Sequence, residues 1–435
     1  MRSVHEARAT ATQPLVAGSG LGHGPDWQTA LDQALDGALG PLAGRVPDLL
    51  LLFASDAYAP SFGDLLGRAQ QRSGTRALAG CSASGVIAGD RELEAVPAVA
   101  ALALAWGAGT SAHLVRVEPD DLLADDEDRA PATSLRVQGE ASRDTAYLPQ
   151  NADWAARLGQ SASACGGLIV LADPFTTDVL ALVGGLERAV PGVPVVGGLA
   201  SSAPTRRQTH VFWGTRAAPR GAVVIALAGA VGLRPVVSQG AQPIGAPWTI
   251  TDAAGHIVRT IGNRPAYTVL VETLEQLAPA ERQRAARNLL VGLAMNEYRD
   301  DFGRGDFLIR NLLGADPSSG ALAVGAELRV GQTLQFQIRD AHAADDELRH
   351  MLQATAQQPP QAAAALLFAC NGRGAGLFGA PDHDARTARE LLGPVPLAGL
   401  FCNGEIGPVD GTTYLHGFTA SLALLGPLVP QPPAN

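Results

Sequence analysis

The strongest constraint on the fold is a pattern that occurs three times along the chain. Each copy begins with a continuous apolar run, typical of a strand buried on both faces, and continues through a helical stretch into a second apolar strand. A turn that contains glycine follows the second strand. The copies occupy residues 48–85, 167–202 and 362–407, and a further apolar strand follows each, at 98–106, 221–229 and 416–425. The repeat predicts β-α-β-β units, and therefore an α/β protein whose mixed sheets are flanked by helices.

The repeat also predicts how the chain is divided. A fourth, weaker copy is expected at 281–313, where a helical stretch leads into two strands. Two units in each half predict a two-lobed molecule, with an N-terminal module at 1–232 and a C-terminal module at 233–426. Near the start of the second half, residues 247–276 predict a β-hairpin that leads into a helix beginning near Pro265.

Two segments do not fit the repeat. Residues 118–128 carry seven acidic side chains and no basic one, and polar sequence continues beyond them. We expect a solvated loop at 118–150, without a metal, because no calcium-loop pattern occurs in it. The proline-rich tail at 427–435 is expected to be disordered.

Composition excludes several classes of protein. The chain has 32 basic residues and no lysine, so every one of them is arginine. A Walker A phosphate-binding loop, a pyridoxal phosphate enzyme, a Schiff-base aldolase and a protein kinase each need a lysine, and all four are excluded. The net charge of −10 argues against nucleic acid as a partner, because phosphate binding depends on clustered basic side chains.

The same survey indicates a cytoplasmic protein. No apolar run approaches the roughly 20 residues of a membrane span, and the N-terminus shows no signal peptide. The four cysteines share no C-x-x-C spacing, so neither a zinc cluster nor a thioredoxin motif is expected. We therefore predict a protein of a reducing compartment with no membrane partner.

Small and polar residues gather where the strands of the copies end, and ligands of open α/β sheets bind beyond those ends. An arginine near a glutamate suits a zwitterionic ligand, because guanidinium pairs with carboxylate and carboxylate with ammonium. Two alternatives remain: the glycine- and serine-rich segments are only tight turns, or Arg373 and Glu405 form an internal salt bridge. The candidate ligand-binding residues at these ends are Cys81, Ser82, Gly198, Ser201, Asn371, Arg373, Phe401, Cys402, Asn403 and Glu405.

Other patterns resemble catalytic or cofactor motifs but fail in detail. Residues 374–379 match G-x-G-x-x-G, yet the following helix begins too late for a dinucleotide site. The segment around Ser82 is no nucleophile elbow, because position 84 is serine rather than glycine. His416, at the start of a predicted core strand, is more typical of a structural residue than of a ligand to metal or haem. A carboxylate near Cys402 would raise the pKa of its thiol, which disfavours a nucleophile.

Over most of its length the chain resembles the FIST family, named for F-box and intracellular signal transduction proteins. In the first half the resemblance rests on PDLLLLFAS, LAGCSASGVIAG and VPVVGGLASS. In the second half it rests on DFLIRNLLGADPSSGALAVGAELRVGQTLQFQIRDA, LLFACNGRGAGLFG and LAGLFCNGEIGPVDGTTYLHGFTASLAL.

The resemblance implies a sensory module that binds a small ligand such as an amino acid, and not an enzyme. No kinase, cyclase, methyl-accepting or F-box segment is visible in the chain, so a separate partner, such as a histidine kinase, would carry the signal. The positions that the resemblance marks are Gly80, Cys81, Ser82, Arg310, Asn371, Arg373, residues 404–408, His416 and Thr419.

Three functional hypotheses follow. We expect a stand-alone sensory protein that uses no cofactor and binds an amino acid or a carboxylate-like metabolite. The alternative implied by some relatives is a haem-based nitric-oxide sensor that regulates a histidine kinase, with His416 as the axial ligand. A hydrolase that uses Cys402 or Ser82 is the third.

Overall fold

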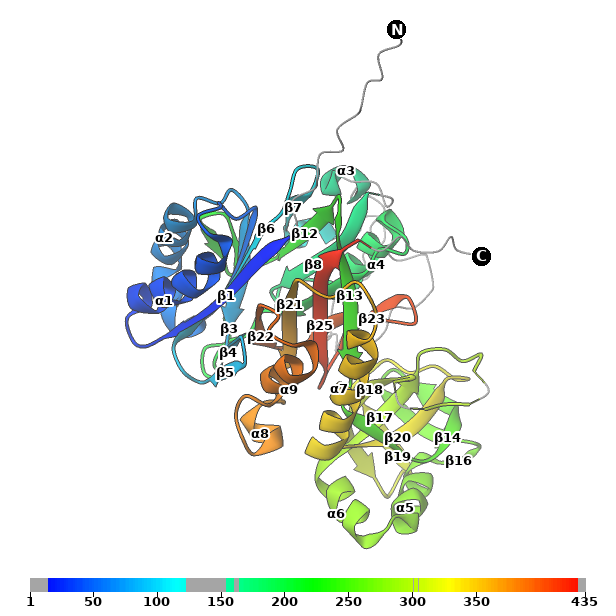
Figure 1. The fold of residues 1–435 in the computed structure, drawn as a ribbon. Coiled ribbons are helices and arrows are strands. Elements are labelled where there is room, and N and C mark those ends of the chain that lie inside the picture. Colours follow the sequence, from blue (N-terminus) through cyan, green and yellow to red (C-terminus); the bar gives the residue numbers. More distant parts are fainter. Residues whose placement is uncertain (1–14, 123–153, 160–163, 300, 304, 429–435) are drawn as a thin grey trace.

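The computed structural model describes residues 15–122, 154–159, 164–299, 301–303 and 305–428 (Figure 1). Figure 1 shows a large lobe of three sheets with their helices, and a smaller lobe at the lower right of the view. Most of the predicted acidic loop, and the predicted tail from residue 429, lie outside the described residues. The start of that loop forms the short 3-10 helix η3 (Pro119–Leu122).

The three predicted copies are confirmed as β-α-β units. In each, two strands pair in parallel and a helix connects them, and the following strand pairs antiparallel with the first of the two. The parallel strands are β2 (Leu49–Ser55) with β3 (Leu78–Ala83), β8 (Cys165–Ala172) with β9 (Val195–Leu199), and β21 (Ala364–Cys370) with β22 (Leu397–Cys402). The connecting helices are α2 (Phe62–Ser73), α4 (Val179–Ala189) and α9 (His383–Leu392), and the antiparallel strands are β6 (Ala98–Ala105), β12 (Ala222–Ala228) and β25 (Ala420–Pro427).

Alternate residues of the apolar runs explain why both faces of each sheet are buried. Leu51 and Phe53 of β2 pack into a core shared by all three sheets, whereas Leu50 and Leu52 pack under the helices. The outer faces are covered by α1 (Trp27–Leu39) and α2, by α3 (Trp154–Leu158) and α4, and by α7 (Ala341–Ala356) and α9. No helix of the described segments is both long enough and apolar enough to cross a bilayer.

Each sheet is completed by a hairpin that comes from a different repeat. The hairpin of the first repeat joins the sheet of the third, that of the second joins the first, and that of the third joins the second. All three six-stranded sheets therefore have the same strand order and directions. The exchanged hairpins are β4 (Gly85–Ala88) with β5 (Arg91–Glu94), β10 (Val211–Trp213) with β11 (Arg216–Ala218), and β23 (Glu405–Val409) with β24 (Thr412–His416). The outermost strands on the other side are β1 (Val16–His23), β7 (Ser111–Val117) and β13 (Val231–Ser238).

One glycine position recurs in the three repeats because the strands approach closely there. Gly80, Gly197 and Gly399 occupy the same place in their parallel pairs. A Cβ atom at these positions would lie 1.8, 1.9 and 1.9 Å from a carbonyl oxygen of the neighbouring strand. Only glycine fits, and this register also aligns the residues that follow each strand.

The smaller lobe is an antiparallel barrel and not a fourth copy of the repeat. The prediction for 281–313 is wrong, because β17 and β18 pair antiparallel and the described residues between them form no helix. The strands follow the order β14-β20-β17-β18-β19-β15, and β15 pairs with β14 to close the barrel. The predicted hairpin and helix at 247–276 are confirmed as β14, β15 and α5. The elements are β14 (Ala241–Ala254), β15 (Ile257–Ile261), β16 (Arg264–Pro265), α5 (Ala266–Gln276), α6 (Pro279–Asn288), β17 (Leu289–Ala294), β18 (Phe307–Asp316), β19 (Ala321–Val324) and β20 (Thr333–Arg339).

We predict that Gly80→Ala destabilises the protein by about 3 kcal/mol or more, because the methyl group would force β2 and β3 apart. The matched control is Gly67→Ala in helix α2, where a Cβ atom meets nothing within 4 Å. That change should be neutral or stabilise by up to about 1 kcal/mol, because alanine favours the helix. Urea denaturation measures both, and equal midpoints for the two variants would contradict the close-approach argument.

Candidate functional site

The residue four positions after the recurrent strand glycine is polar in every repeat. These equivalent residues are Ser84, Ser201 and Asn403. The exchange of hairpins brings them together: the Ser84 amide donates to Ser201 Oγ at 2.8 Å, and Asn403 Nδ2 donates to the Ala200 carbonyl at 3.2 Å. Asn371, after β21, joins them, since it accepts from Ser84 Oγ and donates to Asn403 Oδ1, both at 2.7 Å.

We call Ser84, Ser201, Asn371 and Asn403 the strand-end cluster. Ser201 is buried, Ser84 is half-buried, and both asparagines are exposed to solvent. Each asparagine amide keeps an N–H and a carbonyl lone pair beyond the hydrogen bonds just described. The cluster therefore presents donors and acceptors to solvent at the point where the three repeats meet.

Several predicted residues lie behind this cluster and do not reach solvent. Ser82 Oγ donates to the Ser201 carbonyl at 3.1 Å and accepts from the His210 amide at 2.9 Å. Burial raises the pKa of the Cys402 thiol well above its ordinary value, with Glu405 as the second cause. Three more predicted residues near them are also buried, namely Cys81, Gly198 and Phe401.

The Arg373 side chain lies in the interior of the protein and does not face solvent. Its guanidinium forms a bidentate ion pair with Asp384, at 2.6 and 2.8 Å, and the side chain is fully buried. The alternative of an Arg373–Glu405 salt bridge is wrong, because the ion-pair partner is Asp384 in the first turn of α9. Burial pushes the pKa of Asp384 up, but Arg373 and the adjacent His383 together hold it well below its usual range.

Glu405 is a carboxyl group in a position that the other repeats fill with valine. It pairs across from Gly198, as Val86 and Val211 pair across from the equivalent residues. The side chain is fully buried, and its Oε2 accepts the Thr419 amide at 3.1 Å. Burial raises the pKa of Glu405 well above its usual range, which favours the neutral form of the acid.

His416 is the last residue of β24. The prediction that it starts a core strand is therefore wrong, because that strand, β25, begins at Ala420. The residue is 3% exposed, and its Nε2 lies 2.9 Å from the Gly407 carbonyl. Burial lowers the pKa of His416 to about 4, so the ring is neutral. An axial haem ligand needs a ring nitrogen that faces open space. The residues around His416 therefore do not fit a haem, since one nitrogen is hydrogen-bonded and the other is enclosed.

Arg310, also predicted, lies on β18 of the barrel. It donates to the carbonyls of Ile309 at 3.0 Å and Leu415 at 3.4 Å, so it joins the barrel to the β23–β24 hairpin.

Sequence reasoning missed Arg339, the last residue of β20. Its Nη2 donates to the Gly372 carbonyl at 2.8 Å, and its guanidinium carbon lies 4.7 Å from the centre of the Phe418 ring. Burial, and then the charge of Arg373, lower the pKa of Arg339 to about 10. A visible signal was the alternation of TLQFQIR, which places Gln335, Gln337 and Arg339 on one face of a strand.

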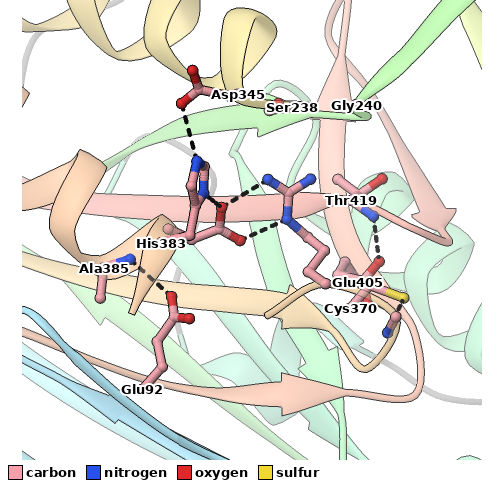
Figure 2. A network of polar contacts seen from close by, with 12 residues as sticks. Glu92, Ser238, Gly240, Asp345, Cys370, His383, Ala385, Glu405 and Thr419 are labelled. Carbon is pink, nitrogen blue, oxygen red and sulfur yellow. Dashed lines mark hydrogen bonds and ion pairs between the residues drawn. The ribbon is translucent and has the colours of Figure 1, made fainter. Parts of the chain in front are cut away.

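Glu92 was also missed, and it ties the first repeat to helix α9 (Figure 2). It lies on β5, and its Oε1 accepts the Ala385 amide at 2.9 Å. Its own amide donates to Asp382 at 2.7 Å. Burial, reinforced by the Asp384 charge, raises the pKa of Glu92 to about 8.

A surface cavity of about 340 Å³ lies at the opposite end of the sheets. Its lining includes Asp48 and Ala77, which precede the amino ends of β2 and β3. It is therefore separate from the strand-end cluster, which follows the carboxyl ends.

The family is settled by comparison with known proteins. The FIST N domain matches residues 48–264 and the FIST C domain matches residues 266–408. The chain therefore belongs to the FIST family of small-ligand sensory domains, as the sequence motifs predicted. The module division near residue 232 stays a prediction.

The chain also has full-length relatives. An uncharacterised protein of Mycobacterium bovis is 38% identical over 409 residues, which are 94% of this chain and 98% of that protein. An uncharacterised protein of Mycobacterium tuberculosis is 38% identical over 408 residues, with the same coverage. Among solved structures, a cyanuric acid hydrolase aligns over 95% of this chain and 100% of its own with 10% identity, but the TM-score of 0.30 carries no argument.

We predict that the wild-type protein loses stability as the pH rises from about 5 to about 8. The folded-state pKa of Glu92 is about 8, above its ordinary value of 4.5, so the native state binds more protons across this window. The stability that Glu92 contributes is present below the unfolded pKa and is lost as the pH rises through the folded one. Glu92→Gln keeps the acceptor for Ala385 but removes the titration, so its stability should depend less on pH.

Urea denaturation at several pH values tests this prediction. The matched control is Glu327→Gln, at an exposed glutamate of the barrel, which should leave the slope as it is in the wild type. If Glu92→Gln and Glu327→Gln gave the same pH dependence, another group would be responsible.

Proposed function

We propose that this FIST protein is a sensory protein that binds a small polar ligand, an amino acid or a carboxylate-like metabolite, at the strand-end cluster. The observation that carries the proposal is the meeting of Ser84, Asn371 and Asn403 in one solvent-facing, hydrogen-bonded group. Amide and hydroxyl groups orient a polar ligand by donating and accepting at once.

The position of the cluster suits signalling. Ser84 and Ser201 belong to the FIST N domain, whereas Asn371 and Asn403 belong to the FIST C domain. A ligand held by both would favour one arrangement of the domains over another, and only such differential affinity can shift a conformational equilibrium. We propose that a separate protein, such as a histidine kinase, reads this arrangement.

The two competing hypotheses have less support. His416 does not fit a haem, for the reasons given above. A hydrolase would need an activated Ser82 or Cys402, yet Ser82 Oγ is engaged with backbone groups on both sides, and burial keeps the Cys402 thiol protonated.

Binding can be tested by thermal-shift screening of amino acids and small carboxylates, followed by calorimetry. Asn403→Ala should weaken the binding of a hit about tenfold, because one or two hydrogen bonds of about 1 kcal/mol each are lost. The control Asn288→Ala, at an exposed residue that ends α6, should bind as the wild type does. The proposal fails if no compound binds at millimolar concentration, or if Asn403→Ala and Asn371→Ala both retain full affinity.

A further inference from the structure

The outer face of β20 carries a row of buried polar side chains. Leu334, Phe336 and Ile338 point into the barrel core, so Gln335, Gln337 and Arg339 share the opposite face. They are only 6%, 1% and 9% exposed. A buried row of amides and a guanidinium on one strand face is unusual, because such groups are costly to remove from water.

Each member of this row has a buried atom without a hydrogen-bond partner in the described part of the chain. These atoms are Gln335 Oε1, Gln337 Nε2 and Arg339 Nε. An unsatisfied buried polar atom costs about 1–3 kcal/mol, so buried polar groups nearly always have a partner in the protein, water or a ligand. Three such atoms in one row point to water or a ligand as their partner.

The row continues from the barrel into the large lobe. Ala241 pairs with Arg339, and a Cβ atom on the preceding Gly240 would lie 3.0 Å from Arg373 Nη1. Arg373 Nη1 also has no hydrogen-bond partner among the described residues. Gln239 Oε1, next to Gly240, and Glu405 Oε1 are also buried without a hydrogen-bond partner among the described residues. The Glu405 carboxyl interacts electrostatically with Arg339 and Arg373.

The two arginines differ in their charge balance. Arg373 has Asp384 as its ion-pair partner and also feels the charge of Glu347. For Arg339, no ion pair with a carboxylate is found among the described residues, and burial raises the pKa of the nearby Glu405. An unpaired buried charge is strongly unfavourable, so a bound anion at Arg339 would relieve a real cost. A planar guanidinium with free N–H groups matches the two oxygens of a carboxylate.

Gly372 lies at the surface beside Arg339. This glycine is exposed, and a Cβ atom there would lie 3.4 Å from Arg339 Nη1 and 3.8 Å from the Phe418 ring. Phe418 is half-buried and has φ +66°, which strains a bulky residue. Strain of this kind gathers at ligand clamps and switch regions.

We propose that the junction between the two lobes is a binding slot in which Arg339 receives the carboxylate of a small metabolite, while Gln335 and Gln337 hold its polar remainder. The slot opens at Gly372, next to Asn371 of the strand-end cluster. It deepens the proposed function by naming the group that takes the ligand's charge, although it rests on different residues.

The test uses the full chain and three pairs of probes: acetate and acetamide, succinate and succinamide, glutarate and glutaramide. Calorimetry and thermal shift at constant ionic strength should detect at least one carboxylate, with its amide counterpart binding at least tenfold more weakly. Arg339→Gln should reduce the affinity of that carboxylate at least tenfold. Arg329→Gln, at an exposed arginine of the barrel, is the matched control and should have no effect.

Two further variants keep the inference testable if Arg339→Gln does not fold. Gln337→Leu replaces a buried amide with an apolar side chain of similar volume. Because a polar group is no longer buried without a partner, the melting temperature of the free protein should rise, and carboxylate binding should weaken. Gly372→Val removes no polar group but places a side chain over Arg339 Nη1, and should also weaken binding.

The outcomes separate the slot from the strand-end cluster. Loss of carboxylate binding in Gly372→Val and Arg339→Gln, with Asn403→Ala within twofold of the wild type, supports the slot and contradicts the cluster as the binding site. The reverse pattern supports the proposed function and overturns the slot. The slot is also overturned if no carboxylate binds at millimolar concentration, or if amides bind as well as carboxylates.

Discussion

The structure depends on an exchange of hairpins between the three repeats. A single repeat supplies only four strands of its sheet, and the outer edge of β3, β9 or β22 would be unpaired without the two strands that another repeat provides. An open, apolar edge of this kind invites association with other chains. The exchange also creates the candidate site, because the hairpins that begin at Gly85 and Glu405 follow the cluster residues Ser84 and Asn403 within two residues. The same exchange of hairpins therefore completes the sheets and brings the polar groups together.

The repeat itself was predictable from the sequence, since strands that are buried on both faces leave long apolar runs. The choice of partner was not predictable, because β4 pairs with β22 more than 300 residues away and nothing in a short hairpin specifies which open edge it joins. The barrel was mistaken for another copy because short strands and a preceding helix give the same local pattern in either topology. At the site, sequence reasoning found Asn371, Asn403 and Glu405. It gave Arg373 the wrong partner, since Asp384, 11 residues along the chain, and Glu405 are both near enough for a pair and only the fold decides.

Burial raises the pKa of every buried carboxyl group at the junction, and the partners of each group decide the net shift. The ion pair with Arg373 and the hydrogen bond of His383 hold the pKa of Asp384 low, whereas the Thr419 amide and the two arginines near Glu405 do not outweigh its burial. Arginine suits such an interior, because its guanidinium keeps its proton where a lysine would lose it. A chain without lysine can therefore hold permanent positive charge deep in its core, at Arg373 and Arg339.

The barrel is an excursion from the third repeat, and its two connections to the large lobe are neighbours. The chain leaves β13 at Ser238, and it returns into α7 just after Arg339, which pairs with Ala241 of the outgoing strand. Two adjacent strands form a neck about which a whole lobe can turn, with Gly240 at φ +67° in one of them. In such a lever, a small shift at the pivot becomes a larger displacement at the far end of the barrel. A ligand held at the neck would thus act on a surface that it does not touch.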